Sequence, residues 1–387
     1  MIIINKTTII DGIPFYLLCF FVSSLIFLLI AVPVSAKKRT DIQSPFACSD
    51  GQTIDHLSWQ AKADPASPPR FGSEPVSVDI GLYVKKLTNI SEVNNSFQVN
   101  AYIETIWCDP RLAFQVNNVG YDRKLLIENN AARALEKIWW PDLVLVNAAD
   151  TVSKTNQELM IFSDGTVVFE EIVAANISTR LNLAKYPFDA HHFDIALESF
   201  AHPKDELLLH LQRDKIGFSD TFNMPSWRVT HHETTVFTVK EIRDRDSFSE
   251  ALLRIHAERI WQPTMYRLAI PLIIIIIVSW SVFWLRPMST GRFGVTFTTI
   301  LTVVAFNFTV SQKLPNVPEI TYLESLYGCS LLLLALVVIE NTSVDRLTAL
   351  GKSAAAENLD RFSRWFFPVL YFLGVTGVTY FFGIIQN

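Results

Sequence analysis

The chain has 387 residues, half of them hydrophobic, and its formal net charge is −5 at pH 7. Its mean hydropathy of +0.26 is too high for one water-soluble domain and too low for a chain that lies wholly inside a membrane. We therefore expect a soluble part joined to a membrane part, and the mildly acidic charge argues against nucleic acid as a partner.

Residues 1–36 have the pattern of a secretory signal peptide. A start that carries Lys6 leads into an uncharged apolar stretch from Ile13 to Val32, and the small residues at 34 and 36 suit cleavage after Ala36. An uncleaved anchor helix is the alternative, because the apolar stretch is long for a signal peptide. Either arrangement exports the segment from Lys37 onward.

Residues 37–75 form an N-terminal extension that ends in the proline-rich run "DPASPPRFGSEP". Cys48 in this extension and Cys108 farther along both lie in the exported region, where a bridge could form. The distance between them in the sequence gives no geometric support for one, so we expect two buried free thiols.

Residues 76–262 alternate between apolar and polar side chains, which is the pattern of half-buried β-strands. "SVDIGLYV" and "SFQVNAYIETIW" are the clearest examples, and "LVLVNA", "LMIF", "GTVVFEEIV", "FDIALESF", "WRVTHHETTVFTV" and "ALLRIHAERIW" follow. Turn signals such as "SDGT" and "DRDS" separate them. This region is predicted to be an extracellular or periplasmic antiparallel β-sandwich of the immunoglobulin-like kind.

Residues 263–387 change to long uncharged stretches, which predict four transmembrane helices. Their expected bounds are about 266–285, 292–312, 319–340 and 362–385. The link at 341–364 carries Arg346, Lys352, Arg361 and Arg364, which favours the cytosolic side. An exported sandwich and four spans place the C-terminus outside a cell (inner) membrane.

Several ordered motifs carry a resemblance to a family. They are "IWCDPRLAF" at 106–114, "IWWPDLVLVNAAD" at 138–150, "YPFD" at 186–189 and "LTVVAFNFTVSQKLPNVP" at 301–318. From about residue 76 to its C-terminus the chain resembles the pentameric ligand-gated ion channels, the Cys-loop receptor superfamily. The namesake disulfide would fall at Thr179 and Phe193, which are not cysteines, and the short 341–364 link leaves no room for a large intracellular domain. Both departures favour a bacterial-type member.

The resemblance implies a homopentamer in a lipid bilayer that binds a small-molecule agonist and conducts inorganic ions, without a cofactor. The second span would line the pore with a stripe spaced every three or four residues, consisting of Gly294, Thr298, Leu301, Ala305 and Phe308. Gly294 and Thr298 would form narrow polar rings, and Leu301, with Phe308 second, would close the pore by dewetting. Packing between helices, where small residues are common, is the alternative explanation of the stripe.

Ion selectivity depends on the segment before the pore helix, "STGR" from Ser289 to Arg292, which has no acidic residue. Cation channels of the family usually carry Glu there. The run "GRFGVTFTTILT" is similar to the anion-channel pattern, and a ring of Arg292 side chains would favour anions. We therefore lean toward anions, with a cation-selective or proton-gated channel as the alternative.

The resemblance also places an agonist site between subunits. Tyr102 would supply its complementary side, and Phe200 and Phe248 its principal side, with Phe248 on a capping loop. Three aromatic faces could hold a cationic amine, or they could be ordinary interface packing. Val146 beside Asn147, and Glu241 on the loop, stand where aromatic residues would strengthen a cationic box, so the agonist stays open.

Coupling from the sandwich to the pore would use a charge cluster at the membrane boundary. By the same resemblance Arg259 pairs with Asp189 of "YPFD" and with Glu92, and Pro187 meets the "KLPNVP" loop that carries Lys313 and Pro315.

The eight histidines include the adjacent pairs 191–192 and 231–232. Neighbours on a strand face opposite ways, so neither pair can chelate one metal ion within a subunit, and no metal site is expected. No nucleophile motif or phosphate loop indicates an enzyme. The competing class is a membrane-anchored solute receptor without a pore, which would not need a polar stripe in its second span.

Overall fold

The computed structural model describes residue 48 and residues 65–69, 74–116, 122–240, 247–287, 289–311 and 320–384. The predicted signal peptide and most of the predicted N-terminal extension lie outside these residues. So do Glu241, Lys313 and Pro315, which stay predictions.

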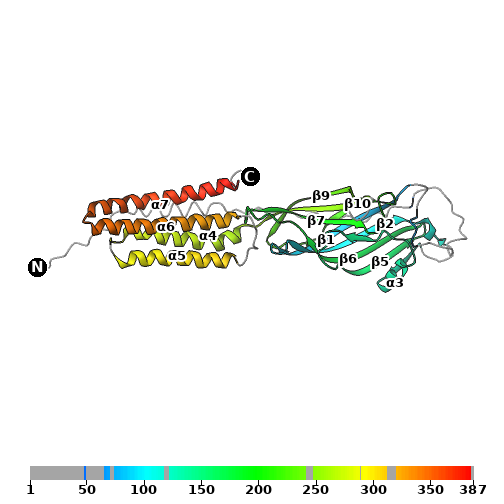
Figure 1. Ribbon diagram of the computed structural model, residues 1–387. Coiled ribbons are helices and arrows are strands. Elements are labelled where there is room, and N and C mark those ends of the chain that lie inside the picture. Colours follow the sequence, from blue (N-terminus) through cyan, green and yellow to red (C-terminus); the bar gives the residue numbers. More distant parts are fainter. Residues whose placement is uncertain are drawn as a thin grey trace. The chain divides into compact units, whose positions relative to one another are not determined.

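Two antiparallel-rich sheets form the first part of the described chain (Figure 1). The six-stranded sheet has the order β3-β5-β6-β2-β1-β8 and the four-stranded sheet the order β4-β7-β10-β9. The strands of the first are β1 (Val76–Ser91), β2 (Ser96–Cys108), β3 (Arg123–Ile127), β5 (Ser153–Phe162), β6 (Thr166–Ser178) and β8 (Leu207–Phe218). Those of the second are β4 (Leu143–Leu145), β7 (Ala190–Ser199), β9 (Trp227–Lys240) and β10 (Ser247–Arg259).

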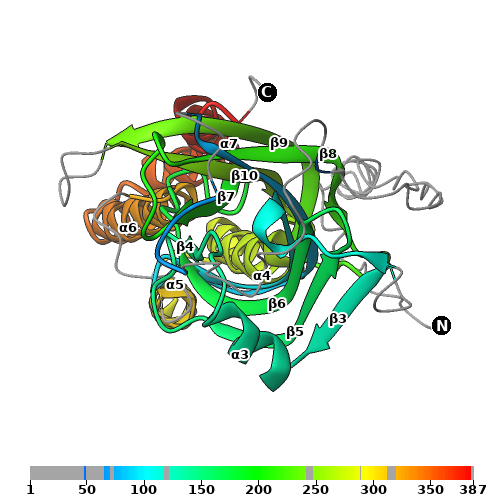
Figure 2. The same cartoon turned by 90° about the vertical axis from the view of Figure 1, so that its right-hand side faces the viewer.

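The predicted β-sandwich is confirmed, with its core between the two sheets. In β2, Val99, Ala101 and Ile103 are buried, while the residues between them face away from the core. The same alternation buries one side of β1 and of β10. Figure 2 shows β9 and β10 on one side of the sandwich and β5 and β6 on the other. Period-2 patterning therefore decided which face of β1, β2 and β10 became core.

The sequence did not predict β3 and β8, because neither strand has a long alternation of apolar and polar residues. A short helix α3 (Asn129–Leu135) packs against β3 and β5, and a 3₁₀ turn η1 (Pro110–Leu112) follows β2. The predicted turn "SDGT" joins β5 to β6, and its Gly165 has φ +90°, where a side chain would be strained.

Four long helices run side by side in the second part (Figure 1). They are α4 (Gln262–Trp280, continued by the 3₁₀ turn η2, Ser281–Trp284), α5 (Thr290–Ser311), α6 (Tyr322–Ala349) and α7 (Ser353–Phe381). Within the described residues, three segments are long and apolar enough to cross a membrane: Gln262–Trp284, Gly291–Phe308 and Tyr322–Ala349.

The segment expected to link the third and fourth spans is mostly helical. α6 continues to Ala349 and α7 already begins at Ser353, so only a short turn separates them. Gly351 in this turn has φ +74°. The basic residues of this segment therefore lie on helical extensions or at the turn, which explains why charge alone did not reveal the helix ends.

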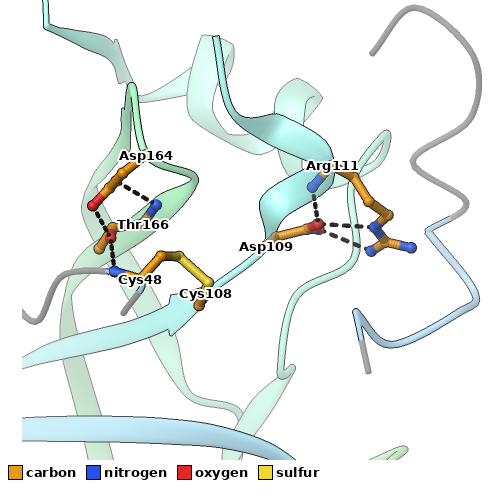
Figure 3. The surroundings of a disulfide bond; sticks show 6 residues. All are labelled: Cys48, Cys108, Asp109, Arg111, Asp164 and Thr166. Atoms are coloured by element: carbon orange, nitrogen blue, oxygen red, sulfur yellow. Dashed lines mark hydrogen bonds and ion pairs between the residues drawn. A yellow bond between two sulfur atoms is a disulfide. The ribbon is translucent and has the colours of Figure 1, made fainter. Parts of the chain in front are cut away.

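The expectation of two free thiols at Cys48 and Cys108 is wrong, because the two form a disulfide with a Cα–Cα distance of 5.5 Å (Figure 3). Cys108 ends β2 opposite Thr166 of β6. The Cys48 N–H donates to Thr166 Oγ1 at 3.1 Å, and the Thr166 hydroxyl and N–H bond the Asp164 carboxylate. Contacts with β6 thus bring Cys48 beside Cys108, which the distance in the sequence could not indicate. The bridge is not at Thr179 and Phe193.

Candidate functional site

The predicted pore stripe lies on one uncovered face of α5. Gly294, Thr298, Leu301, Ala305 and Phe308 are all exposed in the single subunit. Leu301 is 70% exposed and Phe308 69%. Twenty-two residues of helix span about 33 Å, slightly more than the roughly 30 Å hydrocarbon core of a bilayer. Large apolar side chains are therefore left without cover along a helix of membrane-crossing length.

The opposite face of α5 is buried against α4 and α6 and is largely polar. It consists of Arg292, Thr296, Thr299 and Val303. The Thr296 and Thr299 hydroxyls donate to carbonyls one turn back, at Arg292 and Thr296. Asn341 Nδ2 of α6 donates to Thr296 Oγ1 at 2.8 Å. The polar side chains of this face have defined partners, so the rotation of α5 about its axis is fixed.

Arg292 anchors the first turn of α5 with a fully buried side chain. Its Nη1 and Nη2 donate to both carboxylate oxygens of Asp360 in α7, at 3.0 and 2.8 Å. Nη2 also donates to Glu340 of α6 at 3.3 Å, and Nε donates to Asn341 Oδ1 at 3.0 Å. A further bond reaches the Leu285 carbonyl, at the end of η2. One guanidinium thus joins all four helical segments.

The expectation that Arg292 contributes a positive ring at the pore mouth is therefore wrong. Its side chain is on the buried face of α5, away from the stripe, and it is paired with Asp360 and Glu340 within the subunit. The physical reason is desolvation, since a buried guanidinium needs paired carboxylates. The sequence did contain the signal, because Glu340 and Asp360 are acids in or beside apolar helices.

We predict that Asp360→Ala strongly destabilises the helical part of the protein. It removes the bidentate partner of a buried charge, a change that typically costs about 3–5 kcal/mol. The thermal unfolding midpoint of the purified protein should fall by many degrees. Glu357→Gln, an exposed carboxylate on the same helix, is the matched control and should leave the midpoint unchanged. Equal midpoints for the two variants would contradict the anchoring role.

The boundary cluster predicted around Arg259 is present. The Arg259 Nε and Nη2 atoms donate to the two oxygens of Asp189 at 2.8 and 3.0 Å, and Nη1 donates to Glu92 at 2.9 Å. Its guanidinium also lies over the rings of Trp227 at 4.4 Å and Tyr186 at 4.8 Å. The side chain is 8% exposed and that of Asp189 only 1%. This is a strong, oriented ion pair rather than a solvated one.

Asp189 stays charged in this cluster. Burial raises its pKa, but hydrogen bonds from His191, at 2.9 Å, and from Arg259 outweigh it and bring the pKa below the usual 3.8. A depressed pKa means that the stabilisation is present above pH 3.8 and is lost only as the pH falls further. Asp189 therefore cannot titrate between pH 5 and 7.

The loop before β7 connects this cluster to the helices through contacts of Ala184 and Phe188. Pro187 is buried there. The Tyr322 N–H, at the start of α6, donates to the Ala184 carbonyl at 2.8 Å. The Phe188 ring packs 5.2 Å from Trp261 and 5.5 Å from Tyr322. A shift of Asp189 would thus move the residues that contact the beginning of α4 and of α6.

We predict that Arg259→Ala abolishes or greatly shifts gating while agonist binding is kept, because it disconnects Asp189 and Glu92. Arg254→Ala is the matched control, since Arg254 sits on the same strand and makes the same bidentate bond, to Asp194, away from the boundary loop. Concentration–response currents and radioligand or fluorescence binding separate the two effects. Normal gating in the Arg259 variant would refute the coupling role.

The residues predicted for the agonist site lie on different sheets. Tyr102 is on β2, on the face of the six-stranded sheet that points away from the core. Phe200 is 55% exposed and directly follows β7, and Val146 is 41% exposed and directly follows β4. Both of these strands belong to the four-stranded sheet. Within one subunit the structure does not bring Tyr102 together with the other two. They could share a ligand only across a contact between subunits.

Two of the predicted site residues have other positions than expected. Phe248 is the second residue of β10, pairs with Val239 and is 3% exposed, so it neither belongs to the capping loop nor faces outward. The Asn147 side chain donates to the Asp194 carbonyl at 2.8 Å and holds the loop after β4 against β7. A side chain bound to the main chain in this way positions the loop and is not presented to a ligand.

The sequence analysis missed the acidic surroundings of Tyr102. Its phenol is half-buried and hydrogen-bonded to Glu170 of β6, and burial, followed by the nearby Glu170, Glu104 and Glu158 carboxylates, raises the pKa of Tyr102. Burial likewise raises the pKa of Glu170. Lys215 of β8 donates to Glu104 at 2.6 Å. These acidic residues occupy outward positions on neighbouring strands. The sequence would have revealed that they lie together only if the β2–β6 register had been known.

Comparison with known proteins now identifies the family. Residues 53–260 match the neurotransmitter-gated ion-channel ligand binding domain. The chain is 25% identical to a proton-gated ion channel of Gloeobacter violaceus over 306 residues, which are 79% of this chain and 83% of that protein. It is 25% identical to the mouse gamma-aminobutyric acid receptor subunit gamma-3 and 24% identical to the beta subunit of Lymnaea stagnalis, over 66% and 64% of this chain.

The chain therefore belongs to the neurotransmitter-gated ion-channel family, a family of integral membrane channels with an N-terminal domain outside the membrane and not a family of enzymes. The chain spans about half the length of its gamma-aminobutyric acid receptor relatives, 54% of gamma-3 and 52% of the Lymnaea beta subunit.

Proposed function

We propose that five copies of this chain form an agonist-gated ion channel whose pore is lined by the uncovered stripe of α5. The observation that carries the proposal is the pairing of a polar, fully packed face of α5 with an exposed face bearing Leu301 and Phe308. A helix buried on one side only, in a family of channels, needs either lipid or sister helices on the other. Exposed Gly294 and Thr298 favour sister helices around water over lipid.

In this arrangement the stripe becomes a stack of rings. Gly294 and Thr298 would give a narrow polar section that replaces part of an ion's hydration shell. Leu301, Ala305 and Phe308 would give an apolar section that loses its water when it narrows, so ions cannot pass. Leu301 is the proposed main gate, and Phe308 the second.

The fourth helix and the orientation belong to the same proposal. α7 is 29 residues long and packs against α6, so we place it as a fourth span with the C-terminus outside a bacterial inner membrane. The exported sandwich and the even number of spans support this orientation, and the tight α6–α7 turn supports a bacterial-type chain without a large intracellular domain. Cleavage after Ala36 remains a prediction.

The agonist would bind between sandwiches, with Tyr102 on one subunit and Phe200 and Val146 on the next. Glu104, Glu158 and Glu170 lie near the phenol and their carboxylates raise its pKa, while Lys215 is bound to Glu104. A half-buried carboxylate is stabilised by a cation more than by an anion. This favours a small cationic amine as the agonist class.

The proposed ion selectivity has no support from Arg292, because its side chain is buried and paired with Asp360. The segment from Ser289 to Arg292 still offers no carboxylate that would attract cations to the pore mouth. The lean toward anions therefore depends on the absence of negative charge there.

Recording in a planar bilayer tests this proposal. Amines, amino acids and pH steps are applied to the purified protein, and reversal potentials are measured in asymmetric salt. We expect amine-activated currents with an anion preference, and Gly291→Glu should shift the reversal potential toward cations because it adds a ring of five carboxylates. Glu357→Gln serves as the control. No current under any ligand would contradict the channel, and an unchanged potential in Gly291→Glu would remove this region from selectivity.

A further inference from the structure

Three imidazoles form a row across the four-stranded sheet. Antiparallel pairing sets His256 of β10 directly opposite His192 of β7 on one side and His231 of β9 on the other. The ring centroids of His192 and His256 are 5.3 Å apart, and those of His231 and His256 are 4.0 Å apart and stacked. Residues opposite each other on neighbouring strands point to the same face. The sequence analysis considered only adjacent pairs and so missed this register.

A carboxylate belongs to the same group. Glu233 is two residues after His231, so both side chains project from one face of β9. Glu233 Oε1 lies 3.4 Å from His256 Nε2. Arg254 also approaches Glu233, at 3.7 Å, but its bidentate bonds at 2.8 Å go to Asp194. The Glu233 side chain, 52% exposed, is therefore not committed to Arg254.

We propose that His192, His231, His256 and Glu233 form a binding site for a divalent transition-metal ion of the zinc class. Imidazole nitrogens and one carboxylate oxygen are the ligands that Zn²⁺ takes in tetrahedral protein sites. Two ligands two residues apart on one strand, with a third opposite on the next strand, can surround one point above the sheet.

The side chains must rotate to reach this arrangement. No group of His, Cys, Asp or Glu in the part of the chain that is described is already gathered for a metal, and the stacked rings show why. His192, His231 and Glu233 are exposed, and exposed side chains change rotamer within nanoseconds. Rotation of these exposed side chains would close the site.

The site would link three strands next to the coupling cluster. His256 lies three residues before Arg259 on β10, and His192 three residues after Asp189. The pairing of β9 with β10 is irregular between His256 and Ala257. A metal bound here would hold the two strands together at the irregular step of their register. The proposal does not depend on the pore or on the agonist.

Zinc binding to the purified full chain, prepared without a polyhistidine tag, tests the site. We expect isothermal titration calorimetry with ZnCl₂ at pH 7.5 to show about one ion per subunit. His256→Ala and His231→Ala should each weaken binding by at least about tenfold, because each removes one ligand. His210→Ala, an exposed histidine on β8 of the other sheet, is the matched control and should leave the affinity unchanged.

A second measurement distinguishes ligation from a folding defect. Far-UV circular dichroism confirms that the variants are folded. The proposal is overturned if wild-type protein binds no Zn²⁺ beyond what the folded His256→Ala variant binds, or if His210→Ala weakens binding as much as His231→Ala.

Discussion

The helical part of this protein depends on one buried ion pair, between Arg292 at the start of α5 and Asp360 of α7. A guanidinium removed from water is stable only with its carboxylates in place. Asn341 accepts a hydrogen bond from the Nε of Arg292 and donates one to Thr296, one turn along α5. The buried face of the helix is thereby fixed. The stripe with Leu301 and Phe308 must then face outward from the subunit. The proposed pore thus follows from the packing of the opposite face of α5 inside the subunit.

A second ion pair, between Arg259 and Asp189, has a similar design at the other end of the helices. It too is buried, bidentate and supported by a second acid, Glu92. The loop that carries Asp189 contacts Tyr322 and Trp261, so the sandwich and the helices meet at a group with a defined geometry. In the proposed channel, agonist binding would act on one ion pair and the pore helix would be oriented by the other.

Much of this architecture could be predicted from residue patterns. Alternation at Val99, Ala101 and Ile103 gave the buried face of β2, and the stripe on α5 is exposed as its spacing indicated. Patterns did not tell which neighbour a side chain meets. Arg292 was expected beside water and is paired inside the subunit. The Cys48–Cys108 bridge depends on a contact of Cys48 with β6, and the row through His256 depends on strand register, neither of which a single sequence contains.

The accessibility of α5 to water decides whether its stripe lines a pore. In a Cys329→Ala background, which removes the one free thiol of the described residues, single cysteines replace Gly294, Thr298 or Ala305, and separately Thr296, Thr299 or Val303. A charged thiol reagent is applied from solution to channels in membranes. We expect modification in the first group, increased by agonist, and none in the second. Protection of 294, 298 and 305 in every condition would contradict a water-filled pore along this face.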